Sequence, residues 1–119
     1  MTIAAFRRIA LSMPQAIESA HMGHPDFRVK GKIFATLFTR DDVDWGMVKL
    51  KPEQQRQFVA ETPEVFQSVK GGWGRQGCTQ VCLDAVDRKA LKTLRTAMVT
   101  AWLNVAPKRL VEEFGALTG

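Results

Sequence analysis

The sequence has 119 residues, of which 45% are hydrophobic, and 17 Lys and Arg outnumber 12 Asp and Glu. This length suits one domain and excludes two independent cores; the apolar fraction excludes a disordered chain, and no apolar run approaches the ~20 residues of a membrane span. The net charge of +5 is spread evenly along the chain. It is compatible with nucleic-acid binding without requiring it.

The N-terminal segment predicts a helix over residues 2–12, because its apolar side chains recur at helical spacing. Pro14 ends this helix, and residues 21–25 are predicted as an irregular lead-in to the next element. Arg7 and Arg8 follow the first apolar residues instead of preceding them, so we expect no signal peptide and a soluble cytoplasmic protein. The apolar stripe consists of Ile3, Phe6, Ile9, Ala10 and Met13.

Three strands are predicted next. Residues 27–30 alternate between apolar and basic side chains, which is typical of a strand, and Gly31 marks a tight turn. The β-branched and aromatic run at 33–38 predicts the returning strand. After a polar loop at 41–44, residues 45–50 alternate again and predict a third strand.

The second half begins with a helix over 52–61, opened by Pro52 and expected to bury Phe58 and Val59. Residues 65–70 are predicted as a strand, 71–77 as a loop with four glycines. A further strand is predicted at 78–83.

Asp87 is expected to cap the last long helix, and Pro107 ends it. The tail is predicted to form a short helical turn packed by Leu110 and Phe114. The apolar face of the long helix consists of Leu91, Leu94, Met98, Ala101, Trp102 and Val105.

This order of elements predicts an α+β fold in one domain, residues 1–119, with a single antiparallel sheet packed on one side by the N- and C-terminal helices. Cys78 and Cys82 lie four residues apart in a predicted strand, about 13 Å, and a disulfide needs Cα atoms within about 7 Å. We expect both to be reduced thiols that fill one face of the strand.

Two glycine-bearing turns are candidate binding sites. In the first, Arg28 and Lys30 are expected to project together, with Lys32 just across the turn. The alternative is a solvated hairpin whose lysines keep a sheet edge soluble.

The second turn places Trp73 between Lys70 and Arg75 on a flexible tip, which suits insertion into a groove or stacking on a base. The alternative is that Trp73 folds back as a lid on the core.

The last long helix carries a basic stripe, because Arg88, Lys92 and Arg95 share a face by their spacing. Cations near a helix N-terminus oppose the helix dipole, so a function for this charge is one interpretation. The other is a solvated face on which Asp87 offsets the dipole.

Signals for a metal or for catalysis are weak. His21 and His24 begin a possible site, but a closed site needs about four ligands, and we expect instead that one histidine bonds to backbone. No nucleophile elbow, Walker loop or dinucleotide-binding loop is present. We therefore expect no metal, no cofactor, no catalytic residue and no enzymatic activity.

Short motifs recur in a fixed order along nearly the whole chain: 23–29 (Gly-His-Pro-Asp-Phe-Arg-Val), 31–35 (Gly-Lys-Ile-Phe-Ala), Trp45, 48–50, 52–53, 73–74, Leu83, Asp87, 101–102 and 106–108. Together these motifs resemble those of the MmcQ/YjbR family. Lys51 departs from the family pattern, since a Ser or Asp cap is usual before Pro52, and we expect the start of that helix to fray.

The resemblance implies an α-β sandwich similar to the frataxin/CyaY group and a role as a double-wing DNA-binding protein. The two glycine-bearing turns are candidate wings by hypothesis. Frataxins present an acidic ridge for iron, but here the first helix carries Arg7 and Arg8 and no acid precedes Glu18, which argues against iron.

We therefore expect a non-enzymatic nucleic-acid-binding domain that acts as a monomer, with DNA as its partner and no membrane association. The alternative is a module that binds a protein or a small ligand through the sheet face or under the Trp73 turn. The predicted nucleic-acid-binding residues are Arg28, Lys30, Lys32, Lys70, Trp73, Arg75, Lys92 and Arg95.

Overall fold

The computed structural model describes the backbone of residues 1–118 and the side chains of residues 1–115. Among the described residues, no helix is both long enough and apolar enough to cross a membrane. The elements are, in chain order, α1 (Ile3–Leu11), β1 (Ile17–His21), β2 (His24–Val29), β3 (Lys32–Arg40), β4 (Val43–Lys49), α2 (Pro52–Glu61), β5 (Phe66–Ser68), α3 (Gly72–Arg75), β6 (Cys78–Cys82), the 3-10 helix η1 (Leu83–Ala85), α4 (Arg88–Val105) and α5 (Lys108–Thr118).

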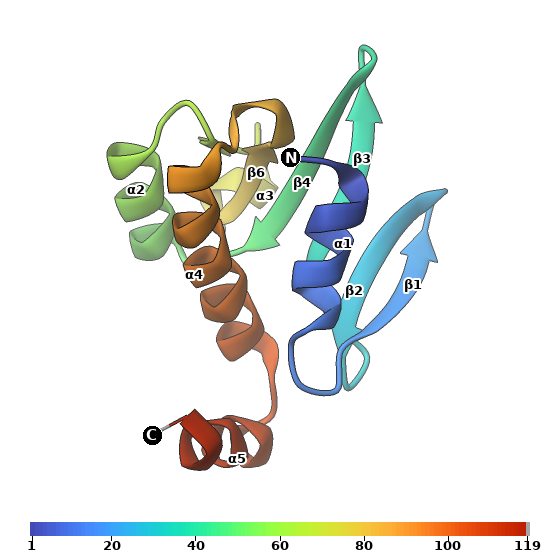
Figure 1. The fold of residues 1–119 in the computed structure, drawn as a ribbon, viewed down its shortest axis with the longest axis vertical. Helices are drawn as coiled ribbons and strands as arrows, with labels where there is room; N and C mark the ends of the chain where they lie inside the picture. The colour runs from blue at the N-terminus through green and yellow to red at the C-terminus, as the bar shows by residue number, and fades with distance from the viewer. Residues whose placement is uncertain (119) are drawn as a thin grey trace.

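The six strands form one sheet in the order β1-β2-β3-β4-β6-β5, and every neighbouring pair is antiparallel. Helices α1 and α4 lie side by side on one face of this sheet (Figure 1). Helix α2 contacts the sheet through the ring of Phe58, whose centroid lies 5.2 Å from that of Phe66 in β5. The predicted α+β fold, with one antiparallel sheet and packed helices, is confirmed.

Three two-residue turns set the register of the first four strands. Both central residues have positive φ in Met22–Gly23 (50° and 79°), Lys30–Gly31 (51° and 81°) and Asp41–Asp42 (54° and 61°). This is the type I′ geometry, whose twist matches that of the flanking antiparallel strands. The turns have no spare residue, so each strand follows the last in a fixed alignment.

The irregular lead-in predicted for residues 21–25 is wrong. His21 ends β1, His24 begins β2, and the two residues pair across the Met22–Gly23 turn. All five residues of β1 are exposed, because β1 is an edge strand that no helix covers. Without a buried face it has no apolar alternation, and its sequence therefore gave no strand signal.

The loop predicted for residues 71–77 is also corrected, because it contains the short helix α3. Gly71 and Gly77 flank this helix with φ of 83° and 110°. Gly74 is needed for packing, since a Cβ there would overlap the Val69 carbonyl oxygen. The tail forms an 11-residue helix, α5, where a short turn was expected.

Helix α2 buries a polar side chain where apolar burial was predicted. Gln55 is buried and donates through Nε2 to the carbonyl oxygens of Gly74 at 3.1 Å and Cys78 at 2.9 Å. Phe58 and Val59 are only half-buried. The start of α2 was predicted to fray because Lys51 lacks a capping side chain. Instead, the Lys51 amide donates to the Gln54 side chain at 2.8 Å and supports this start.

One continuous core lies between the sheet and the helices. Asp87 caps α4 by accepting from the Ala90 amide at 2.8 Å, as predicted, and the indole Nε1 of Trp102 donates to the Pro14 carbonyl at 3.0 Å. The pairing skips Phe34, and this bulge in β3 accompanies burial of both Phe34 and Ala35. The largest fully buried side chains are Trp102, Phe6, Phe27, Phe34, Phe66, Leu37, Leu83, Leu94 and Met98.

Gly46 in β4 is a position where the core leaves no room for a side chain. A Cβ there would lie 2.5 Å from the Phe6 ring, so we expect Gly46→Ala to destabilise the fold by about 1–3 kcal/mol, as overpacking does. Urea unfolding followed by circular dichroism measures this. Gly115→Ala in α5 is the control, because its Cβ meets nothing within 4 Å, and we expect it to be neutral or stabilising.

Candidate nucleic-acid interface

The strand register decides which connections share an end of the sheet. Val29 and Lys32 pair across the β2–β3 turn, and Lys49 at the end of β4 pairs with Cys78 at the start of β6. Strand β5 ends where β6 begins. The β2–β3 turn, the β4–α2 junction and the β5–α3–β6 connection therefore lie at one end, with β4 between the strands β3 and β6.

This end, called the basic end below, carries six exposed basic side chains. None of the six forms an ion pair within residues 1–115. An acidic residue, Glu53, lies at the same end in the first turn of α2. The six are Lys30, Lys32, Lys49, Lys51, Lys70 and Arg75.

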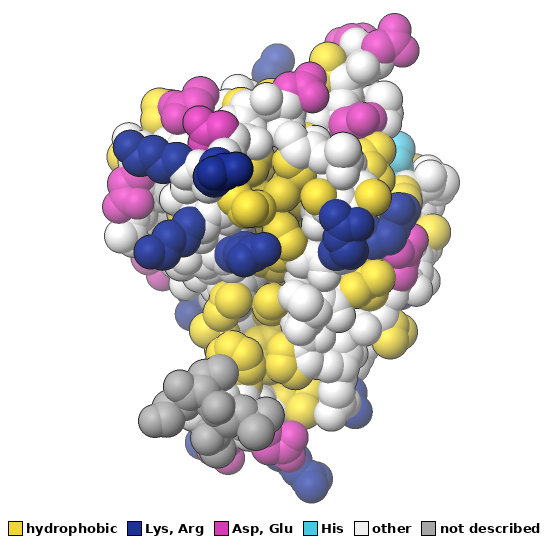
Figure 2. All heavy atoms as spheres, viewed as in Figure 1, with side chains coloured by type: hydrophobic (Ala, Val, Ile, Leu, Met, Phe, Trp, Pro, Cys, Tyr) yellow, Lys and Arg dark blue, Asp and Glu magenta, His cyan; other side chains and the backbone are white. Residues whose placement is uncertain are grey.

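The opposite end of the sheet is mainly acidic. It contains the Asp41–Asp42 turn, the α2–β5 connection and the segment from η1 to the start of α4. Figure 2 shows acidic side chains gathered over the upper part of the molecule. Arg40, Arg88 and Lys89 are basic residues in this region. The acidic residues are Asp41, Asp42, Asp44, Glu61, Glu64, Asp84 and Asp87.

Trp73 is an exposed aromatic side chain of the basic end. It is 65% exposed, so it does not fold back as a lid on the core, and that alternative is wrong. Gln55 of α2 anchors the helix that carries Trp73, because its side chain donates to the carbonyl oxygens of Gly74 and Cys78. This anchored helix exposes the Trp73 indole to solvent between Lys70 and Arg75.

Lys30 and Lys32 flank the tip of the β2–β3 hairpin, and both are exposed. Lys30 has φ of 51° and lies within the turn, so it does not continue the strand alternation that was expected to align it with Arg28. The hairpin therefore presents its two lysines at the tip without Arg28.

Arg28 is held by an internal acid. Its Nε donates to Asp26 Oδ1 at 2.7 Å and its Nη2 to Asp26 Oδ2 at 2.9 Å, while the Asp26 side chain is fully buried. The hydrogen bonds from Arg28 lower the pKa of Asp26 against the opposing effect of burial, and His21 lowers it further. Arg28 thus compensates a buried charge, and it is separate from the free cations of the basic end.

His21 bonds to the same carboxylate, with its Nδ1 2.7 Å from Asp26 Oδ2. The prediction that one histidine bonds to backbone is therefore wrong for His21. The rings of His21 and His24 lie 6.3 Å apart across the turn. No group of three or more His, Cys, Asp or Glu that could hold a metal lies within the described part of the chain.

Lys92 and Arg95 lie on a different surface from the basic end. They belong to the first half of α4, which begins after β6 has reached the opposite end of the sheet. Arg95 lines a groove between α1 and α4, whereas Lys92 lines one between α2 and α4. The structure therefore does not bring the helical stripe together with the two turns.

Lys49 and Lys51 were not predicted as site residues, although they belong to the basic end. The sequence signal for these two lysines is the Lys-Leu-Lys run at the end of the third predicted strand. That run can be assigned to the basic end only once the pairing of the strands is known.

Cys78, opposite Lys49, is a free, buried thiol. Burial raises its pKa despite the nearby lysine, which disfavours a reactive thiolate.

Comparisons with known proteins find one matching family model and solved structures with a similar fold. A family model described as YjbR matches residues 11–104. A Deinococcus radiodurans structure, protein DR2400 with domain name DUF419, has 19% identity and a TM-score of 0.70, covering 96% of this chain and 88% of that one. A Pseudomonas syringae protein, Northeast Structural Genomics Consortium target PsR293, has 17% identity and a TM-score of 0.60, covering 84% and 99%. No curated protein matches the sequence.

Asp26 gives a pH-dependent prediction. Because its pKa is lowered in the folded state, the carboxylate stabilises the fold fully above its ordinary pKa of about 4, and this contribution is lost as pH falls through the folded pKa. We expect Asp26→Asn to lower the urea midpoint at pH 7 and to converge with the wild type in acid. Asp42→Asn, in an exposed turn, is the control; a deficit for Asp26→Asn that is equal at all pH values contradicts the prediction.

Proposed function

We propose that this chain, which belongs to the YjbR family, binds nucleic acid through the basic end of its sheet, as a monomer and without catalysing a reaction. The observation that supports this most is the separation of charge: six cations that form no ion pair within residues 1–115 occupy one end of the sheet, and most of the acids occupy the other. Phosphate contacts dominate nucleic-acid affinity and need such a surface.

The two tips of the basic end have complementary roles in this proposal. The β2–β3 hairpin supplies Lys30 and Lys32 as phosphate contacts. The α3 segment supplies Lys70, Arg75 and the exposed indole of Trp73, which stacks on an unpaired base or wedges between base steps. They are our candidates for two wings on either side of β4.

The acidic end favours one orientation of approach. A charge distribution with opposite signs at its two ends steers a polyanion toward the positive end. Phosphate repels the end with Asp41 and Asp42, so the basic end faces the nucleic acid and the Asp41–Asp42 turn faces away from it.

Fluorescence anisotropy with labelled duplex and single-stranded DNA across a salt series tests this proposal. Each neutralised phosphate contributes about −0.9 to the log–log salt slope on duplex DNA. We expect the triple variant Lys30→Ala, Lys32→Ala, Lys70→Ala to make the slope less steep by about 2.7 if all three residues contact phosphate.

The matched control is the triple variant Arg40→Ala, Arg88→Ala, Lys89→Ala, which removes the same charge at the opposite end of the sheet. We expect it to change the slope by less than about 1. Absence of binding at low salt, or equal losses in both triple variants, would sink the proposal.

Trp73 has a separate test because stacking is independent of salt. We expect Trp73→Ala to weaken single-strand binding by about 1–3 kcal/mol with an unchanged salt slope, and Trp73→Phe to retain most of the affinity. In the wild type, tryptophan emission should be quenched on binding, and most of this quenching should disappear in Trp73→Phe. Unchanged affinity in Trp73→Ala would remove Trp73 from the interface.

A further inference from the structure

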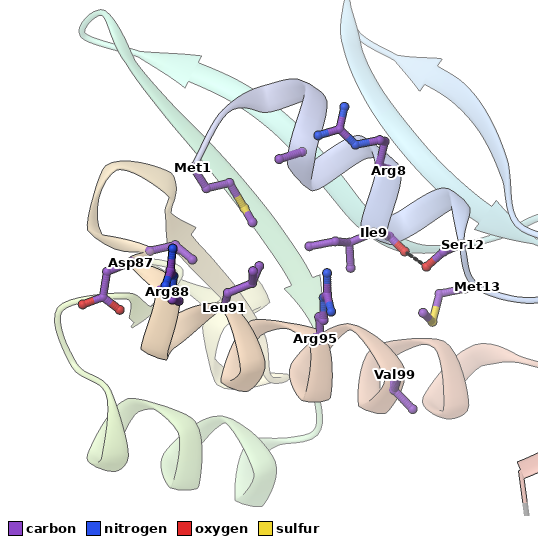
Figure 3. A pocket seen from close by; sticks show the side chains of 12 residues that line it. Met1, Arg8, Ile9, Ser12, Met13, Asp87, Arg88, Leu91, Arg95 and Val99 are labelled. Carbon is purple, nitrogen blue, oxygen red and sulfur yellow. Dashed lines mark hydrogen bonds between the residues drawn. The ribbon is translucent and has the colours of Figure 1, made fainter.

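A groove of about 720 Å³ lies between α1 and α4 on the helical face (Figure 3). Its floor is apolar, formed by Ile9 from α1, Met13 just after α1, and Leu91 and Val99 from α4. Ile9 and Leu91 point toward one another across it. Figure 2 shows this apolar surface between two groups of basic side chains.

Three exposed arginines border this α1–α4 groove: Arg8 on the α1 side, and Arg88 and Arg95 on the α4 side. None of them forms an ion pair within residues 1–115. Asp87 also lines the groove, but its Oδ1 accepts from the Ala90 amide as the helix cap. The groove therefore combines an apolar floor with a rim of uncompensated positive charge.

We propose that the α1–α4 groove binds an amphipathic helix of a partner protein whose apolar stripe is flanked on both sides by Asp or Glu. Two neighbouring helices leave a trough into which a third helix lays its apolar face. The α4 wall runs from Arg88 to Val99, about 16 Å, which matches three turns of a partner helix.

The positions of the arginines constrain the acids of the partner. Arg88 and Arg95 are seven residues apart, so they lie two turns apart on the same wall, about 10.5 Å. A partner helix needs acids two turns apart on the flank that faces α4 and a further acid on the flank that faces Arg8. Arginine binds carboxylates with paired, directional hydrogen bonds, so Asp or Glu side chains at these places would pair with the rim.

Other anionic partners fit the groove less well. A membrane surface is too broad to reach a floor between two helices. A phosphate backbone would contact the arginines but would bury Ile9 and Leu91 against polar atoms, whereas an amphipathic helix covers the floor and meets the rim together. Neither Trp73 nor any of the six cations of the basic end lines the groove.

The test uses a synthetic acidic amphipathic peptide of about 16 residues, with leucines along one stripe and glutamates on both flanks, and a scrambled peptide of equal composition. Titration against the full chain, followed by anisotropy, gives both affinities. We expect the amphipathic peptide to bind at least about tenfold more tightly than the scrambled one. Equal binding of the two peptides overturns the proposal.

The double variant Arg8→Glu, Arg95→Glu should weaken peptide binding at least about tenfold. The matched control Arg56→Glu, Lys89→Glu makes the same charge change at exposed residues outside the groove, and it should weaken binding less than about threefold. Equal losses in the two double variants contradict a binding site in the groove.

Two further measurements separate this site from other ligands. Both double variants should reduce duplex DNA affinity equally; a greater loss for Arg8→Glu, Arg95→Glu assigns the groove to nucleic acid and overturns the proposal. Dodecanoate binding as tight as the peptide assigns the groove to a small amphiphile and also overturns it. The peptide titration does not depend on DNA binding at the basic end, so each of the two proposals can be contradicted without affecting the other.

Discussion

The register imposed by the two-residue hairpin turns is the constraint on which the rest of this structure depends. At Lys30–Gly31 both central residues adopt positive φ, which a type I′ turn requires and glycine readily accepts. A turn of two residues cannot absorb a slip, and a slip of one residue would exchange the two faces of the strand. The positions of Phe27 in the core and of Asp26 on the other face follow from this alignment.

The same register converts an even distribution of charge along the sequence into separation in space. Basic and acidic residues are mixed in both halves of the chain, and no basic tail or cluster stands out. Antiparallel pairing brings the β2–β3 turn, the end of β4 and the start of β6 together, and the basic residues Lys30, Lys49 and Lys70 with them. The Asp41–Asp42 turn lies at the other end for the same reason.

The sequence could predict the elements that have a buried face, and it failed where burial or pairing is not local. The apolar face of α4 was found because Leu94, Met98 and Trp102 recur at helical spacing, whereas β1 is exposed throughout and lacks such a pattern. Arg28 was predicted as a free cation because nothing local shows that Asp26 is buried and needs it. Trp73 was correctly selected, but its exposure depends on Gln55, eighteen residues earlier in the chain.

The two positively charged surfaces differ in what lies beside the cations, and this difference separates their proposed partners. Five of the six cations at the basic end are lysines, which are strongly hydrated point charges and tolerate many phosphate geometries. The α1–α4 groove is bordered by Arg8, Arg88 and Arg95, whose guanidinium groups can pair with carboxylate and with phosphate. The apolar floor between these arginines is therefore the feature that favours an amphipathic helix over a phosphate backbone, and the two proposed partners would occupy different surfaces of the chain.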